Sequence, residues 1–119
     1  MLNKMKLQNV DVYYTKANNK LTSIMILKIK EKDSQQFFEN GNILKIRTLL
    51  VNDNNKGIGK EYLKIVDDIA IKNDIDYIYC TVKMYKNKFI DFLLKNGYKK
   101  YGKYEDEYVY YKELKWAQF

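Results

Sequence analysis

A change of hydrophobic period between residues 43 and 72 constrains the fold of this chain more than any other feature. The run from Ile43 to Val51 is apolar and of strand type. Apolar residues then recur at helical spacing, at Ile58, Tyr62, Ile65, Val66 and Ile69. A second β-type run follows from Tyr77 to Val82. The pattern predicts a strand–helix–strand unit, and because such units cross over right-handed, its two strands should be parallel.

A glycine turn stands between the first strand and the helix of this unit. The polar loop Asn52-Asp53-Asn54-Asn55-Lys56 runs directly into Gly57-Ile58-Gly59. Glycine has no Cβ, so the backbone N–H groups of such a turn can point into one concavity. The positive end of the helix lies behind them, and ligands of open α/β sheets bind near the carboxyl ends of strands. The sequence therefore predicts a phosphate-binding site at this turn.

The remaining segments extend the unit into a mixed, mostly antiparallel sheet. Asn18-Asn19 is predicted to form a hairpin turn between the first two strands. Asn87 is predicted to cap a second helix, which ends at Asn96-Gly97. The predicted strands are residues 9–16, 21–30, 43–51, 77–82, 98–104 and 108–114. The predicted fold is α/β (α+β) in the order β-β-β-α-β-α-β-β, as one domain over residues 1–119.

The charge of the chain narrows the class of partner. The formal net charge is +7, but 21 of the 22 basic residues are lysine, and Arg47 is the sole arginine. Proteins that read nucleic acid exploit the forked guanidinium group of arginine. The charge therefore argues against a nucleic-acid partner and predicts an attraction to anionic cofactors. No apolar run approaches the roughly 20 residues of a membrane helix, so no membrane partner is expected.

The absence of histidine removes several chemistries. It excludes the common catalytic triads and most zinc sites, and no metal site is predicted. The single cysteine, Cys80, is predicted to be buried packing, since no histidine can activate it. One cysteine and no signal-peptide stretch in Met1 to Asn9 fit a reducing compartment, and we expect a cytoplasmic location.

In their order along the chain, these features resemble the GNAT superfamily of acetyl-CoA-dependent N-acetyltransferases. The signature of that family is Arg or Gln, two residues, Gly, one residue, then Gly or Ala, between a strand and a helix. The matching stretch here is Asn54-Asn55-Lys56-Gly57-Ile58-Gly59. The segment from Asn87 to Tyr98 is similar to the second cofactor-facing helix of the family, which ends in Gly and an aromatic residue. Residues 108–114 resemble its last strand, so the resemblance covers most of the chain.

The resemblance implies acetyl-CoA as the acyl donor and a primary amine as the acceptor. The diphosphate would be held by the main-chain amides of Asn54, Asn55, Lys56, Gly57, Ile58, Gly59 and Lys60. Leu49 and Val51 would hydrogen-bond the pantetheine arm through their main chains. Asn87 stands one residue from the position where the family uses an asparagine on the same arm.

The chain departs from the family pattern at positions that matter for the reaction. Asn54 replaces the Arg or Gln that steadies the loop. Leu93 occupies the position where the family often places a tyrosine that protonates the departing sulfur, and leucine cannot donate a proton. Tyr85 is the predicted substitute as catalytic acid, with solvent as the other source of the proton.

The largest departure is at the start of the chain. The family usually has a strand and two helices before the first hairpin, whereas only Met1 to Gln8 precedes it here. Without those helices the acceptor side should be open, which favours a large acceptor such as a lysine on a protein. Alternatively, a second subunit of a homodimer supplies the missing wall, with Phe37-Phe38 or residues 116–119 packing there.

Two classes of function are compatible with these residues. The first is an N-acetyltransferase that acts on an amine of a protein or another large acceptor. The second is a binding or regulatory protein that kept the fold, lost catalysis and engages an acidic partner through its lysines. Leu93 and the missing helices favour the second class, whereas the glycine turn favours the first.

Overall fold

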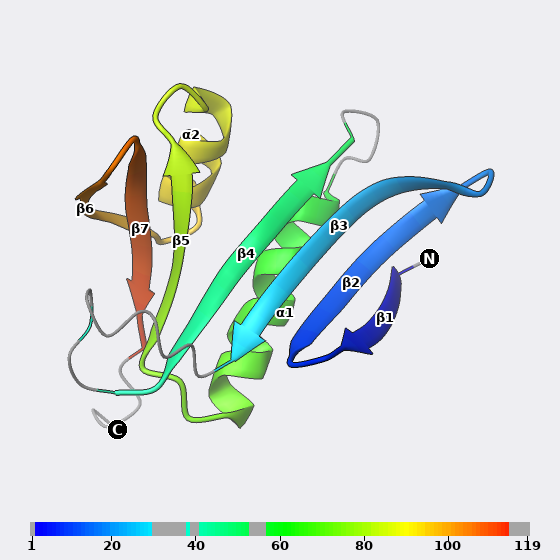
Figure 1. The fold of residues 1–119 in the computed structure, drawn as a ribbon, viewed down its shortest axis with the longest axis horizontal. Coiled ribbons are helices and arrows are strands. Elements are labelled where there is room, and N and C mark those ends of the chain that lie inside the picture. Colours follow the sequence, from blue (N-terminus) through cyan, green and yellow to red (C-terminus); the bar gives the residue numbers. More distant parts are fainter. Residues whose placement is uncertain (1, 30–37, 39–40, 53–56, 115–119) are drawn as a thin grey trace.

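The computed structural model describes residues 2–29, 38, 41–52 and 57–114, which form one seven-stranded sheet and two helices (Figure 1). The strands are β1 (Leu2–Leu7), β2 (Val10–Ala17), β3 (Lys20–Ile29), β4 (Ile43–Val51), β5 (Tyr77–Lys83), β6 (Lys99–Tyr104) and β7 (Glu107–Glu113). The helices are α1 (Ile58–Lys72) and α2 (Asn87–Lys95). The strand order across the sheet is β1-β2-β3-β4-β5-β7-β6. β4 and β5 pair in parallel and the other described pairings are antiparallel, which confirms the predicted mixed sheet.

β1 is a seventh strand that the sequence pattern did not predict. It pairs antiparallel with β2 through a turn at Gln8-Asn9, where Gln8 has a φ of 53°. Lys4 and Lys6 interrupt the apolar residues of β1, and the strand is exposed from Lys4 onward. The alternation that marks a half-buried strand is therefore weak here. Pairing with β2 alone is what makes this edge segment a strand.

Two local turn signals are confirmed. Asn18 and Asn19 both have positive φ, 52° and 63°, as a two-residue hairpin turn between β2 and β3 requires. Gly97 follows α2 with a φ of 91°, and the amide of Tyr98 donates to the carbonyl of Leu93 at 3.0 Å. This pattern satisfies the last carbonyl groups of the helix, as expected for a glycine at that position.

The prediction that Asn87 caps α2 is wrong. The N-cap is Lys86, which makes no side-chain capping hydrogen bond, and Asn87 is the first residue inside the helix. The amide of Asn87 donates to the carbonyl of Tyr85 at 3.0 Å. The tight turn after β5 therefore starts the helix one residue earlier than the cap preference of asparagine indicated.

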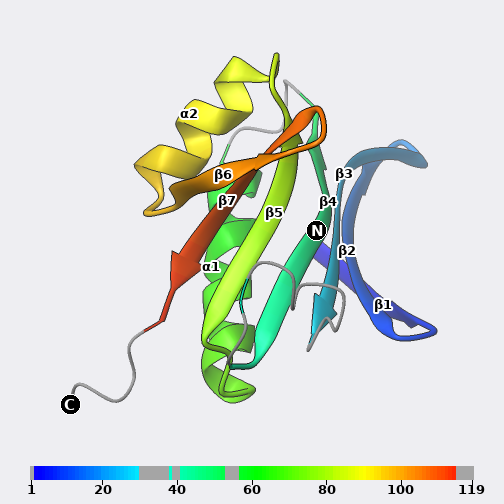
Figure 2. The ribbon, with the colours of Figure 1, turned by 60° about the vertical axis from the view of Figure 1, so that its left-hand side comes forward.

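Both helices pack on the same face of the sheet, as the two views in Figures 1 and 2 show. Fully buried side chains from the strands and α1, including Met25, Leu27, Leu44, Tyr62 and Ile78, form the core between them. Neither α1 nor α2 combines the length and the apolar character that a membrane-crossing helix needs.

The opposite face of the sheet carries a smaller aromatic cluster around Phe38. The ring of Phe38 stacks on Tyr77 at a centroid distance of 4.6 Å and contacts Tyr79 and Tyr111. Phe38 is buried in this cluster, whereas Phe37 and residues 116–119 lie outside the described part of the chain.

Candidate functional site

β4 and β5 pair over a short length and then separate. The parallel ladder joins Ile43–Lys45 to Tyr77–Tyr79, although both strands continue beyond it. In the ladder with β3 the register skips Arg47, which forms a β-bulge in β4. A bulge bends the strand that contains it. Figure 1 shows β4 and β5 diverging toward their carboxyl ends. The bulge comes two residues after Lys45, the last residue of β4 that pairs with β5.

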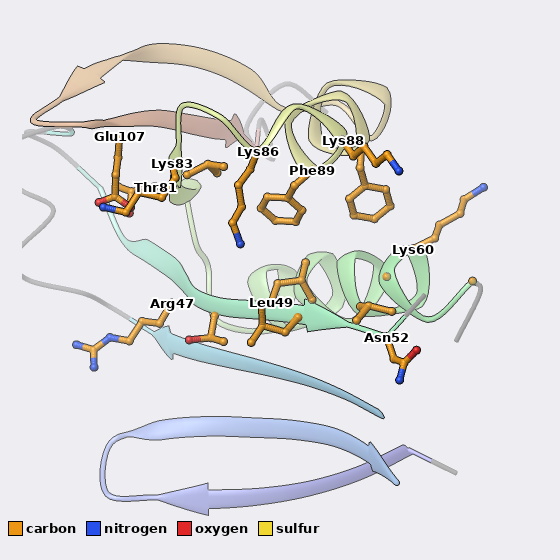
Figure 3. Close-up of a pocket in the computed structure, with 17 residues that line it drawn as sticks. Arg47, Leu49, Asn52, Lys60, Thr81, Lys83, Lys86, Lys88, Phe89 and Glu107 are labelled. Carbon is orange, nitrogen blue, oxygen red and sulfur yellow. The ribbon is translucent and has the colours of Figure 1, made fainter. Parts of the chain in front are cut away.

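This separation opens a cleft of about 730 Å³ (Figure 3). One wall consists of β4 and the start of α1, and the other consists of β5, the turn after it and α2. From Ile46 to Val51, β4 pairs with β3 but not with β5. The main-chain groups on that edge of β4 therefore face the cleft, where an extended ligand can hydrogen-bond to them.

The start of α1 forms one end of the cleft. Gly57 is the N-cap, with a φ of 85° and no side-chain capping hydrogen bond. The first intrahelical bond runs from the amide of Glu61 to the carbonyl of Gly57, at 3.1 Å. The amides of Ile58, Gly59 and Lys60 precede this bond, so they have no acceptor within the helix. Such a helix start, with Gly57 and Gly59 lining the cleft, is suited to bind an anion.

The charged side chains of the cleft are mostly cationic. Its described lining includes the five basic residues Arg47, Lys60, Lys83, Lys86 and Lys88. Glu107 is the one acidic residue in this part of the lining. In Figure 3 the side chain of Lys86 points into the cleft beside Phe89. The excess of positive charge creates a potential that attracts an anionic ligand.

Lys83 is held at the rim by an acidic neighbour. Its Nζ donates to Asp106 at 2.9 Å, in an exposed ion pair between β5 and the β6–β7 turn. The hydrogen bond raises the pKa of Lys83 and lowers that of Asp106. In a solvated pair of this kind the contribution to stability is small, so the pair mainly fixes where the ammonium group stands.

The structure brings five of the predicted cofactor-binding residues into the cleft lining, and these are Leu49, Val51, Gly57, Gly59 and Lys60. Ile58 is buried beneath the turn, with its side chain in the core. Asn54, Asn55 and Lys56 lie outside the described residues. Asn87 is exposed, and Tyr85 is 75% exposed; neither is among the described lining residues.

Two further residues singled out from the sequence lie in the core. Leu93 is fully buried against the other core side chains and offers no proton to the cleft. Cys80 is 3% exposed, and burial raises the pKa of its thiol to about 12. The thiol therefore stays protonated at neutral pH, which agrees with the interpretation of Cys80 as packing.

The sequence patterns missed most of the wall formed by β5 and α2. Lys83, Lys86, Phe89, Phe92 and Glu107 all line the cleft. Phe89 and Phe92 fall three residues apart, so they share a face of α2, and their rings stack at 6.2 Å. That spacing was visible in the sequence, but it is also the spacing of ordinary core residues. Glu107 enters through the antiparallel pairing of β7 with β5, which no local signal encodes.

Comparison with known proteins finds similarity in structure. A scan against protein-family models finds no match to this sequence, and neither does a search of curated proteins. The crystal structure of the PaiA N-acetyltransferase of Thermoplasma acidophilum, in complex with coenzyme A, gives a TM-score of 0.72 at 19% identity. It aligns with 89% of this chain, and this chain spans 62% of that protein.

Two other solved structures illustrate the same similarity. A GNAT family acetyltransferase of Elizabethkingia anophelis with acetyl-CoA bound gives a TM-score of 0.65 at 17% identity, over 89% of this chain and 77% of that one. Arabidopsis thaliana Naa50, in complex with the bisubstrate analogue CoA-Ac-MVNAL, gives 0.66 at 21% identity, over 87% and 72% of the two chains. At these identities the likeness concerns the fold.

Proposed function

Because the chain has the fold of the GNAT acetyltransferases, we propose that it is an N-acetyltransferase that transfers an acetyl group from acetyl-CoA to a primary amine. The observation that carries the proposal is the cleft between β4 and β5, which ends at the start of α1. Two of the similar structures hold coenzyme A or acetyl-CoA.

The residues of the cleft fit the chemistry of coenzyme A. Its diphosphate suits the helix-start amides of Ile58, Gly59 and Lys60, with the ammonium groups of Lys86 and Lys88 nearby as counter-charges. Its pantetheine arm is a linear chain of two amides, which suits the edge of β4 at Leu49 and Val51. The contributions of Asn54, Asn55, Lys56 and Asn87 are part of the same proposal.

The reaction proposed is an acyl transfer. Acetyl-CoA supplies an acetyl thioester. The nitrogen of a neutral amine forms a bond to the acetyl carbon, the carbon–sulfur bond breaks, the nitrogen loses a proton and the sulfur gains one. Main-chain N–H groups of β4 beside the bulge at Arg47 are proposed to stabilise the negative charge that develops on the carbonyl oxygen. Leucine has no proton to donate, and Leu93 is buried. The proton for the sulfur is therefore assigned to Tyr85 or to solvent.

The acceptor is proposed to enter at the end of the cleft opposite the glycine turn. Figure 3 shows Arg47, Thr81, Lys83 and Glu107 at that end, away from Lys60 and Asn52. Glu107 is half-buried and is the one carboxylate in the described lining, so it is suited to attract a cationic amine and orient it. Its role would be recognition of the acceptor.

The class of acceptor is proposed to be a lysine or another amine on a protein. The turn at Gln8-Asn9 joins β1 directly to β2, so no helix stands between these strands. In the family, helices before the first hairpin wall the acceptor site. A site that lacks these helices cannot enclose a small acceptor on many sides. The bisubstrate analogue bound to Arabidopsis Naa50 carries a peptide, which supports a macromolecular acceptor for this fold.

A second candidate function is a binding protein that retains the cleft but does not catalyse transfer. The observation in its favour is Leu93, which is buried where the family often uses a proton donor. Such a protein would bind coenzyme A, or an acidic partner, without releasing free thiol from acetyl-CoA.

Thermal unfolding with and without acetyl-CoA tests the proposal. A ligand that binds only the folded state at a hundred times its dissociation constant should add about 2.7 kcal/mol to the free energy of unfolding. No change in Tm at millimolar acetyl-CoA would overturn the enzyme proposal. If Tm rises, release of free thiol from acetyl-CoA with lysine-containing peptides then separates the enzyme from the binding protein.

The assignment of Glu107 is tested in the same thiol-release assay. Glu107→Gln should raise the KM for the peptide, while the dissociation constant of acetyl-CoA stays unchanged. A variant that binds acetyl-CoA less well, with its peptide KM unaltered, would contradict a role in acceptor recognition.

A further inference from the structure

A chain of hydrogen-bonded hydroxyl groups joins α1 to β3 and β2. The hydroxyl of Tyr62 on α1 lies 2.6 Å from Oγ of Ser23 on β3. Ser23 Oγ is hydrogen-bonded to Oγ1 of Thr15 on β2, which lies 2.7 Å from Oγ1 of Thr22. Tyr62, Ser23 and Thr15 are 0%, 3% and 7% exposed, so the chain runs through the interior.

Two of these residues, Thr22 and Ser23 of β3, bond to the chain on both sides of the glycine turn. On one flank the carbonyl of Thr22 accepts a hydrogen bond from the amide of Asn52, at 2.9 Å, just beyond the end of β4. On the other flank Ser23 holds Tyr62, which follows Glu61, the first residue whose amide bonds within α1. Thr22 and Ser23 therefore fix where β4 ends relative to where α1 begins.

Filling space does not explain these hydroxyl groups. A phenylalanine at position 62 and an alanine at position 23 would occupy almost the same volume without burying a polar group. Buried hydroxyl groups cost free energy unless they are hydrogen-bonded, whereas a satisfied network specifies one geometry of the groups it joins. Burial raises the pKa of Tyr62, so its hydroxyl keeps a proton and can serve as donor or acceptor.

We propose that Tyr62 is a positioning residue for the anion site, and that its bond to Ser23 holds the start of α1 in place relative to the end of β4. The amides of Ile58, Gly59 and Lys60, which have no acceptor within the helix, are then held in place before any ligand arrives. A helix start that is already fixed in place loses less conformational entropy when it binds an anion. The expected effect of Tyr62 on coenzyme A affinity rests on the proposed function. The expected effect of Tyr62 on the structure of the free protein does not.

Tyr62→Phe tests the proposal against a matched control, Tyr98→Phe. Tyr98 is also buried, at 2% exposure, but its hydroxyl has no hydrogen-bond partner in the described part of the chain and belongs to no part of the cleft. Ser23→Ala breaks the same link from the other side, and it serves if Tyr62→Phe folds poorly. Each variant is compared with the wild type by amide hydrogen exchange and by titration with coenzyme A.

In Tyr62→Phe, the amides of Asn52 and Glu61 should exchange about two- to tenfold faster relative to the amides of β5, as expected for loss of one hydrogen bond. Ser23→Ala loses two hydrogen bonds, to Tyr62 and to Thr15, so it should speed the exchange at least as much. The dissociation constant of coenzyme A should rise by a similar factor. Tyr98→Phe should leave both quantities within twofold of the wild type.

Three outcomes are distinguishable. Unchanged exchange at Asn52 and Glu61 would overturn the proposal, because the flanks would then be held without Tyr62. Faster exchange with an unchanged dissociation constant would also overturn it, because the link would have no bearing on the anion site. A wild type that does not bind coenzyme A refutes the proposed function instead, and the exchange data then decide alone whether Tyr62 holds the turn.

Discussion

Gly59 at the start of α1 lies directly against the ring of Phe92 on α2, so that a methyl group on Gly59 would stand 3.2 Å from Cζ of Phe92. The two helices approach each other at this point because residue 59 has no side chain. Gly59 and Phe92 both line the cleft, and Phe89 lies next to Phe92 on the same wall.

Gly59→Ala should therefore destabilise the protein. Alanine favours a helix over glycine by about 1 kcal/mol, but overpacking a filled contact typically costs about 1–3 kcal/mol. Because Phe89 stacks beside Phe92, we expect the second effect to prevail and the urea midpoint to fall. Gly59→Ala combined with Phe92→Leu should recover the midpoint.

Gly102→Ala is the control, since an added methyl group meets nothing within 4 Å there. Equal urea midpoints for Gly59→Ala and Gly102→Ala would contradict the contact between Gly59 and Phe92.

Gly57→Glu should abolish the stabilisation by acetyl-CoA, because it places a carboxylate where a phosphate is proposed to bind. Gly57→Gln is the matched control, since both side chains meet the same strain at a φ of 85° and both find open space around the position. The two variants should lose similar stability without ligand. Only the glutamine variant should keep a rise in Tm with acetyl-CoA, and an equal rise in both would place the diphosphate elsewhere.

Lys86→Gln should weaken coenzyme A binding by about two- to fivefold, the range expected for one exposed charge. Lys86 points into the cleft, whereas Lys103 is exposed on β6 and is absent from the described lining. Lys103→Gln should leave the dissociation constant unchanged. Titration at two salt concentrations checks the cause, because the difference between wild type and Lys86→Gln should shrink as salt screens the charge.

Tyr85→Phe should change kcat by less than about twofold. Tyr85 is 75% exposed and absent from the described lining of the cleft, so we expect solvent to protonate the departing thiolate. A positioned general acid contributes about 10²- to 10⁴-fold to a rate. A fall of that size in the thiol-release assay would instead establish Tyr85 as the proton donor and show that the turn after β5 moves toward the cleft during turnover.

Cys80 should make stability depend on alkaline pH. Burial raises its pKa from 9.0 to about 12, so between these values the unfolded chain releases a proton that the folded protein retains. The contribution to stability is complete below about pH 9 and is lost as pH rises toward 12. Between pH 8 and pH 10.5 the wild type should lose on the order of 1–2 kcal/mol more than Cys80→Ala. Urea unfolding of both proteins at the two pH values measures this difference, and parallel losses would contradict the burial of the thiol.

Several elements followed from residues that are close together in the chain. The switch from an apolar run to helical spacing predicted β4 and α1, and Gly57 adopts the left-handed conformation at their junction. Asn18-Asn19 and Gly97 also take positive φ where their turns require it. In each case the preference belongs to the backbone of one or two residues, so it can be read locally. β1 was not predicted, because its hydrophobic alternation is weak and its strand conformation depends on pairing with β2.

The sequence by itself determined the order of most elements and the glycine turn at the start of α1. Only the tertiary structure decided that β4 bulges at Arg47 and leaves β5 after three paired residues on each strand. It also decided that Glu107 reaches the cleft through β7 and that Tyr62 meets Ser23 across thirty-nine positions of sequence. The physical reason is that hydrophobic periods and turn preferences act over a few residues, whereas a cleft and a buried hydroxyl chain depend on which strands become neighbours.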